Sequence, residues 1–266
     1  GKIKNNNKAK EFYLTDTIEE AYREKLNIQS LKLSDIDEAL GCNTLEELQT
    51  LERAYHLSVA KKHLNKGVLF ANIERVSFRG DVSIEKGAFI DENVIFEGQV
   101  SIGSGAKIGP GCIVHNSSIG KNAELLAYTL VEESVLENNA KAGPFAHVGV
   151  QTKMDDGAEI GNFVEVKRSH IGANSKAKHL TYIGDAKIGK GVNIGAGTIF
   201  CNYDGKNKNQ TIIEDGTFIG SNSSLVAPLR LGEGSFTGAG SVITKNIPKG
   251  KLGVGRGKQV NLNKKK

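Results

Sequence analysis

Residues 84–114 read IEKGAFIDENVIFEGQVSIGSGAKIGPGCIV, and an apolar residue returns at every sixth position of this stretch. The residues in this register are Ile84, Ile90, Phe96, Ile102, Ile108 and Val114. A β-strand repeats its buried side chains every two residues and an α-helix about every 3.6, so neither produces a long period of six. Hexapeptide-repeat β-helices do, because each hexad supplies one short strand and one corner, and three hexads close a coil.

The register resumes after one skipped residue and continues toward the C-terminus. Its later members are Ile119, Leu125, Ile160, Val166, Ile171, Ile183, Ile188, Ile194, Phe200, Ile213, Ile219, Leu225, Leu231, Thr237 and Ile243. Glycine follows many of them and reaches 32 of 266 residues, whereas Trp is absent. Glycine permits the tight backbone of a corner, and a narrow core has no room for large aromatic side chains. The predicted fold class is mainly β, a parallel β-helix preceded by a long helix and a small α/β remnant.

The composition changes near residue 67, because the preceding segment is rich in Leu, Glu and Lys. A helix is predicted over 17–25, capped by Thr15 or Asp16, then a strand over 28–33 and a short helix over 34–41. Asn43 and Glu46 predict the capped start of a longer helix. We expect an incomplete domain at 1–42, a connecting helix at 43–66, the β-helix at 67–250 and a tail at 251–266.

Composition also limits the possible functions. Apolar residues make up 38% and charged residues 24% of the chain, which is enough apolar content for a folded core. No apolar run is long enough to span a bilayer, and the start GKIKNNNKAK lacks the apolar stretch of a signal peptide. Three scattered cysteines predict free thiols, and the net charge of +5 includes a terminal lysine run that we interpret as a solvated end. We expect a cytoplasmic protein with neither membrane nor nucleic acid as a partner.

The hexad register breaks between Phe200 and Ile213, where the chain inserts CNYDGKNKNQTI. Loops on a rigid scaffold often carry function. Four polar residues within this insertion favour a functional loop over a plain surface loop: Asn202, Tyr203, Asp204 and Lys208.

Several motifs carry a resemblance to a known family. They are FVEVK at 163–167, SKAKHLTYIGDAKIG at 175–189, VNIGAGTIFCNYDGKNK at 192–208 and FIGSNSSLVAP at 218–228. These resemble the acetyltransferase half of the bacterial bifunctional N-acetylglucosamine-1-phosphate uridyltransferase/glucosamine-1-phosphate acetyltransferases. Residues 5–18 and 41–55 are similar to the end of the uridyltransferase domain and its connecting helix, so 1–42 is interpreted as a remnant of that domain.

The resemblance implies a left-handed β-helix that assembles as a homotrimer. It also implies that acetyl-CoA donates an acetyl group to the amine of glucosamine 1-phosphate. The product would feed UDP-N-acetylglucosamine synthesis for peptidoglycan and lipopolysaccharide.

The resemblance also assigns site residues. His179 is similar to the catalytic base, which suits an imidazole because the attacking amine must lose a proton near neutral pH. Glu165 resembles the carboxylate that orients this histidine, and Asn202 is expected beside the reacting amine. The sugar-phosphate contacts correspond to Lys167, Tyr182, Asn193 and Lys208. The positions expected to face acetyl-CoA are Ala196, Asn202, Tyr203, Ser221, Ala239 and Arg256. No metal ligand is predicted in this half.

Two departures from the family pattern matter. The family typically has arginine and proline where this chain has Gly149 and Val150, which predicts weaker phosphate binding and a raised KM for glucosamine 1-phosphate. Residues 1–66 contain no glycine-rich nucleotide-binding loop, so we predict no uridyltransferase activity. Mg²⁺ would serve only that missing half, and Asn43 is interpreted as a helix cap rather than a metal ligand.

Three alternatives remain open at the level of the sequence. The altered HVGVQ stretch at 147–151 is also compatible with an acyltransferase that acts on another amino sugar. A noncatalytic scaffold with a decayed site is a second possibility, although His179, Asn202 and Tyr203 argue against it. A zinc-dependent carbonic anhydrase is disfavoured because the histidines do not show the spacing of its ligands.

Overall fold

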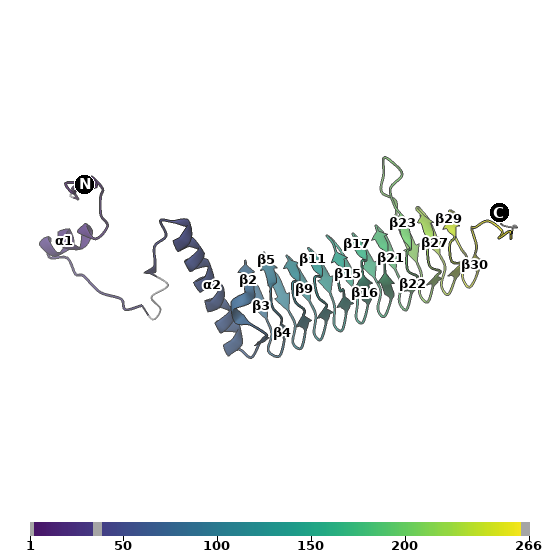
Figure 1. The fold of residues 1–266 in the computed structure, drawn as a ribbon, viewed down its shortest axis with the longest axis horizontal. Coiled ribbons are helices and arrows are strands. Elements are labelled where there is room, and N and C mark those ends of the chain that lie inside the picture. The colour runs from purple at the N-terminus through teal and green to yellow at the C-terminus, as the bar shows by residue number, and fades with distance from the viewer. Residues whose placement is uncertain (1–2, 34–38, 262–266) are drawn as a thin grey trace, which may run out of the picture. The chain divides into compact units, whose positions relative to one another are not determined.

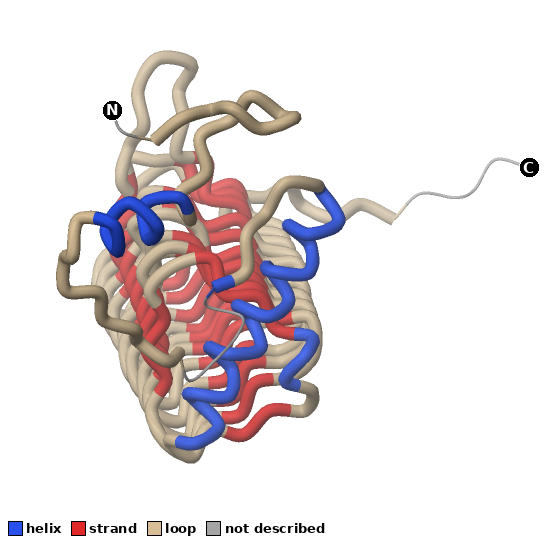
Figure 2. The backbone as a smooth tube through the Cα atoms, turned by 90° about the vertical axis from the view of Figure 1, so that its left-hand side faces the viewer, coloured by secondary structure: helices blue, strands red, loops and turns tan. Residues whose placement is uncertain are grey.

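The computed structural model describes residues 3–33 and 39–261. The chain divides into two compact units, Gly1–Glu52 and Arg53–Lys266. The second unit contains a stack of parallel coils, which Figure 1 shows side on and Figure 2 shows after a 90° turn. No helix among the described residues has both the length and the apolar character needed to cross a membrane.

Each coil contributes strands to three parallel sheets, which we call faces A, B and C. Face A contains β1 (Leu69–Phe70), β4 (Phe89–Ile90), β7 (Lys107–Ile108), β10 (Glu124–Leu125), β13 (Lys141–Ala142), β16 (Glu159–Asn162), β19 (Lys176–His179), β22 (Asn193–Ile194), β25 (Phe218–Ile219), β28 (Phe236–Thr237) and β30 (Leu252–Gly253). Face B contains β2 (Val76–Arg79), β5 (Val94–Glu97), β8 (Ile113–His115), β11 (Leu130–Glu132), β14 (His147–Val148), β17 (Glu165–Lys167), β20 (Tyr182–Gly184), β23 (Ile199–Cys201), β26 (Ser224–Val226) and β29 (Val242–Ile243). Face C contains β3 (Val82–Ile84), β6 (Val100–Ile102), β9 (Ser118–Ile119), β12 (Val135–Leu136), β15 (Lys153–Met154), β18 (His170–Ile171), β21 (Ala186–Ile188), β24 (Thr211–Ile213) and β27 (Leu229–Leu231).

The hexad register builds the core, as predicted. The residues that define it in 84–114 are all buried. Ile84 pairs with Ile102 and Ile90 pairs with Ile108, so one coil takes eighteen residues, or three hexads. Beyond the skipped residue the coil shortens by one, since Ile102 pairs with Ile119. The prediction of a parallel hexapeptide-repeat β-helix is therefore confirmed.

A helix covers the first coil of the second unit. Helix α2 spans Leu45–Asn65, and a short 3₁₀ turn η2 follows at Ile73–Arg75. The backbone N–H of Phe78 donates to Nδ1 of His56 at 3.1 Å, and the ring of His63 stacks on Phe78 with 5.9 Å between centroids. Ala60 is fully buried on the same side of the helix. These contacts close one end of the apolar interior.

The first unit agrees with the prediction at one element and differs at another. Helix α1 forms at Asp16–Arg23, close to the expected 17–25. The strand predicted over 28–33 is wrong: this segment is irregular, because the described residues of the unit, 3–33 and 39–52, include no second strand to pair with its N–H and C=O groups. The helix predicted over 34–41 lies mostly outside the described residues.

The start of α2 is shifted by one residue from the predicted cap. Thr44 is the capping residue, since its Oγ1 accepts from the N–H of Glu47 at 3.2 Å. Glu47 reaches back to the N–H groups of Asn43 and Thr44, at 2.6 and 3.0 Å. The Asn43–Glu46 capping box is therefore wrong, because the Thr44–Glu47 pair satisfies the free N–H groups of the first turn instead.

Candidate functional site

The corner at which the chain passes from face A to face B collects five of the predicted residues. His179 ends β19, Ala196 follows β22, Ser221 follows β25, Ala239 follows β28 and Arg256 follows β30. They stand on five successive coils, and neighbouring strands are about 4.8 Å apart, so together they span roughly 19 Å. We call this row the A–B corner column.

Hydrogen bonds between neighbouring coils hold this column in register. The carbonyl of Ala196 accepts from the N–H of Asn222 at 2.8 Å, and the carbonyl of Ser221 accepts from Gly240 at 2.8 Å. Arg256 folds back so that Nη1 donates to the carbonyl of Ala239 at 2.7 Å. Among the hydrogen bonds of the described residues, none uses the N–H of Ala196, so it is free to donate to a ligand.

His179 lies exposed at one end of this column. Its Nδ1 is 2.6 Å from Oδ1 of Asn162, which is its partner residue on the preceding coil. Because an amide oxygen only accepts, the neutral ring carries its proton on Nδ1 and has its lone pair on Nε2. This hydrogen bond therefore favours the tautomer in which Nε2 can accept a proton. Sequence reasoning missed Asn162, although the seventeen-residue spacing of one coil connects the two positions.

Glu165 does not take the role predicted for it within this chain. It lies on face B, where it forms an ion pair with Lys167, and its Oε1 is 3.9 Å from Nδ1 of His147. It is aligned with Tyr182 on the next coil, beyond the corner that carries His179. Asn162 replaces it as the hydrogen-bond partner of the histidine because Asn162 stands on the same corner.

Face B brings together Lys167, Tyr182 and Asn202. Lys167 pairs with Gly184, and a Cβ added to Gly184 would lie 2.5 Å from both the hydroxyl of Tyr182 and Nδ2 of Asn202. The two polar groups thus converge above a position that has no side chain. Gly149 is next to them: its own Cβ would lie 3.0 Å from Cγ of Lys167. The position where the family has an arginine is therefore beside the lysine predicted to bind phosphate.

Asn202 is buried and hydrogen-bonded to a charged group. Its Nδ2 donates to Oδ2 of Asp185 at 2.5 Å. Arg168 donates to both oxygens of Asp185, from Nε at 2.7 Å and from Nη2 at 2.9 Å. The Arg168 guanidinium holds the pKa of Asp185 below its usual range, against the opposing effect of burial. Asp185 therefore stays ionised next to the Asn202 amide.

Asn193 and Lys208 lie apart from this group. Asn193 is on face A, aligned with Lys176 on one side and Phe218 on the other. Lys208 is on the inserted loop, which Figure 1 shows projecting beyond β23. Its charge helps to lower the pKa of Asp185, so its side chain is within electrostatic reach of the face B residues.

The inserted loop is internally ordered. Asp204 accepts hydrogen bonds from the N–H groups of Lys206 and Asn207, at 2.8 and 2.7 Å, and from Nδ2 of Asn209 at 3.0 Å. Tyr203 pairs with Lys208 across an antiparallel bridge, and its hydroxyl donates to the carbonyl of Gly205 at 2.7 Å. The hydrogen bonds from Asn207, Lys206 and Asn209 lower the pKa of Asp204 to about 2.

This pKa predicts the pH range in which the loop keeps its shape. A carboxylate with a depressed pKa stabilises the folded loop fully above its ordinary value, and the effect is lost as the pH falls through about 2. We expect the NMR amide shifts of Lys206 and Asn207 to titrate with a midpoint near this value. Asp204→Asn should abolish the titration, and a midpoint near the ordinary aspartate value would contradict the described hydrogen bonds.

A shallow hollow of about 400 Å³ lies on face B beside these groups. Its lining residues are Phe145, His147, Phe163, Val164, Glu165, Leu180, Thr181, Tyr182 and Ile199. A larger hollow of about 480 Å³ lies on face C and contains none of the predicted residues. The face B hollow is the better candidate because two of the predicted residues, Glu165 and Tyr182, line it.

An exposed apolar row, which the sequence analysis did not predict, leads to His179. Tyr128, Phe145, Phe163 and Leu180 occupy the A–B corner of successive coils, each with a positive φ. The ring of Phe145 stacks on Tyr128 and on Phe163, with 5.3 and 5.6 Å between the ring centroids. All four residues are nevertheless at least half exposed. Exposed apolar rows of this kind mark contact surfaces.

A three-sided coil of hexads with a histidine and an ordered loop on its surface defines a hexapeptide-repeat protein. Residues 81–116 match the family described as "Bacterial transferase hexapeptide (six repeats)", and residues 210–245 match "Hexapeptide repeat of succinyl-transferase". Among the described residues, no three His, Cys, Asp or Glu side chains are grouped so as to hold a metal ion.

More particularly, the chain is a homologue of the proteins named "Bifunctional protein GlmU". The GlmU of Baumannia cicadellinicola subsp. Homalodisca coagulata is 46% identical over 258 residues, which cover 97% of this chain and 55% of that protein. The GlmU of Acinetobacter baylyi is 44% identical over 259 residues, covering 97% and 57%. The chain thus spans about half the length of these relatives, and the resemblance to the bifunctional family is confirmed.

Among solved structures, similarity is found to LpxA, "a UDP-N-acetylglucosamine acyltransferase from Bacteroides fragilis 9343". The TM-score is 0.40 and the identity is 21%, over 63% of this chain and 67% of that one.

Proposed function

We propose that this chain transfers the acetyl group of acetyl-CoA to the amine of glucosamine 1-phosphate. The observation that carries the proposal is the position of His179, whose Nε2 is free to accept a proton at one end of the A–B corner column. The similarity to GlmU over nearly the whole chain supports the choice of substrates. The product would enter UDP-N-acetylglucosamine synthesis for the cell envelope, in the cytoplasm.

In the proposed reaction the sugar amine attacks the thioester carbonyl. The new C–N bond forms as the C–S bond breaks, coenzyme A leaves as the thiolate, and Nε2 of His179 accepts the proton from the amine. The free N–H of Ala196 is suited to stabilise the oxyanion that develops on the carbonyl. Ser221, Ala239 and Arg256 would contact the extended coenzyme A along the column, with Tyr203 near the acetyl group.

The acceptor would bind through face B and the inserted loop. Lys167 and Lys208 supply positive charge for the phosphate, Tyr182 and Asn193 supply polar contacts, and Asn202 would hold the amine. We assign 67–250 to this acetyltransferase domain, 43–66 to the connecting helix, 1–42 to a uridyltransferase remnant and 251–266 to the tail. The exposed aromatic row on the A–B corner suits burial between subunits of a homotrimer.

A direct assay tests the proposed function. With acetyl-CoA and glucosamine 1-phosphate, we expect release of free coenzyme A thiol and formation of N-acetylglucosamine 1-phosphate, detected by mass spectrometry. With UTP and N-acetylglucosamine 1-phosphate, the same protein should form no UDP-sugar. Absence of thiol release would refute the acetyltransferase, and formation of the UDP-sugar would refute the remnant assignment.

Gly149 favours one alternative, an acyltransferase for a different amino sugar. The position beside Lys167 lacks the arginine that the family uses for phosphate. Free glucosamine and a nucleotide-linked amino sugar should therefore be compared with glucosamine 1-phosphate. A higher kcat/KM for either would replace the proposed acceptor while leaving the acetyl transfer intact.

A further inference from the structure

We propose that Arg168 and Asp185 are positioning residues that fix the orientation of the Asn202 side chain, so that its carbonyl oxygen faces the acceptor amine. This inference rests on the proposed function. No motif of the sequence analysis assigned a role to Asp185.

The direction of the Asn202 amide follows from its partner. An ionised carboxylate can only accept hydrogen bonds, so the group that faces Asp185 must be the NH₂ end of the amide. The low pKa of Asp185 keeps the carboxylate in this form near neutral pH. Oδ1 of Asn202 therefore points away from Asp185.

That oxygen remains available to a ligand. The buried side-chain atoms without a partner in the described part of the chain are His63 Nδ1, Thr152 Oγ1, Thr211 Oγ1, Ser235 Oγ and Ser241 Oγ. Asn202 Oδ1 also accepts no hydrogen bond from the described residues, yet it is not one of these buried atoms. The oxygen is therefore in contact with solvent, although Asn202 as a whole is only 6% exposed. An acceptor oxygen at this place suits an incoming amine, which donates N–H.

The carboxylate is itself fixed from the other side. Arg168 binds Asp185 through two nitrogens of its planar fork, and the side chains are only 26% and 18% exposed. A bidentate pair restricts rotation of the carboxylate more than a single bond does. The three residues thus form one chain of contacts across three successive coils, from β17 past β20 to the end of β23.

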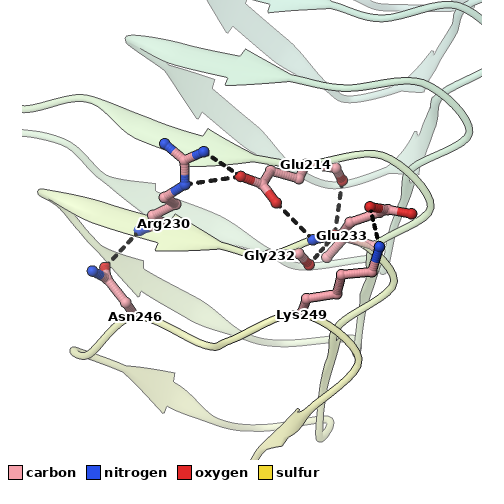
Figure 3. Close-up of polar contacts among 7 residues, drawn as sticks. Glu214, Arg230, Gly232, Glu233, Asn246 and Lys249 are labelled. Carbon is pink, nitrogen blue, oxygen red and sulfur yellow. Dashed lines mark hydrogen bonds and ion pairs between the residues drawn. The ribbon is translucent and has the colours of Figure 1, made fainter.

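The same protein contains a matched ion pair on face C. Arg230 donates to Glu214 from Nε at 2.8 Å, and Glu214 accepts from the N–H of Glu233, as Figure 3 shows. Glu233 in turn pairs with Lys249. No predicted site residue contacts this cluster, so Glu214→Ala removes a comparable carboxylate without touching Asn202.

The experiment is a mutant cycle on the full chain with acetyl-CoA and glucosamine 1-phosphate. We expect Asp185→Ala to lower kcat by about tenfold to a hundredfold, because a misplaced contact group loses the aligned geometry. KM for acetyl-CoA should change less than kcat does, since the predicted acetyl-CoA contacts on the A–B corner column are untouched. Asp185→Asn, which keeps an acceptor but loses the charge, should retain more of kcat than Asp185→Ala.

The double variant decides whether Asp185 acts through Asn202. If it does, Asp185→Ala combined with Asn202→Ala should have the same kcat as Asn202→Ala alone, within about twofold. Glu214→Ala should leave kcat unchanged even where it lowers Tm. The inference is overturned if the kcat losses of the two single variants multiply in the double variant, or if Asp185→Ala has the same kcat as an active wild type. Either result leaves the proposed function standing. An inactive wild type overturns the proposed function together with the inference.

Discussion

His179→Ala is expected to lower kcat for acetyl transfer by about 10²- to 10⁴-fold, the usual contribution of a general base. The imidazole is on the surface and makes its one described side-chain hydrogen bond to Asn162, so its removal leaves the core intact. Tm should therefore change little. The release of coenzyme A thiol measures kcat, and a thermal melt of the same sample measures Tm.

His115→Ala is the matched control for this variant. His115 also contacts an asparagine side chain, with Nε2 at 2.9 Å from Nδ2 of Asn116, but it belongs to β8, several coils away. Its replacement should leave kcat unchanged. A His179→Ala enzyme with nearly full kcat would remove the histidine from the mechanism, whatever the fold.

Gly149→Arg is expected to lower KM for glucosamine 1-phosphate by about tenfold to a hundredfold. A hydrogen bond to a charged group contributes about 1.5–3 kcal/mol, which corresponds to that range. The new Cβ would lie 3.0 Å from Cγ of Lys167, 3.1 Å from the carbonyl oxygen of Val166 and 3.3 Å from Nε2 of His147, so these neighbours must shift by a few tenths of an ångström. A thermal melt of the variant therefore accompanies the KM measurement.

Gly149→Met is the control that distinguishes the effect of the added positive charge from the effect of the added side-chain volume. It adds a long side chain at the same place without a positive charge, so KM should not fall. The arginine effect should also weaken as salt increases, since exposed charges are screened. If Gly149→Arg leaves KM unchanged, the absence of the family's arginine does not limit phosphate binding here.

The core could be predicted from the sequence because its signal is local and repeated. Ile90 and Ile108 are buried for the same reason as every other member of their register, and their pairing follows from three hexads per coil. The strand expected at 28–33 failed because a strand depends on a partner, which its own residues do not reveal.

The assignment of the site residues stays a prediction, and the contacts among them could not be predicted from the sequence. His179 and Arg256 do lie on one corner, as their places in successive coils require. The contact between His179 and Asn162 and the contact between Asp185 and Asn202 both join residues seventeen apart on neighbouring coils. Many polar pairs share that spacing, so side-chain geometry was needed to choose among them. The expected contact between Glu165 and His179 was not found, because Glu165 lies on face B, where it pairs with Lys167.

The helix that covers the first coil has a consequence for polymerisation. A stack of parallel strands can in principle grow from either end into a fibre, because each terminal strand exposes unpaired N–H and C=O groups. Here Phe78 already donates its N–H to His56 of the helix, which blocks one end. The helix therefore opposes growth of the stack from this end.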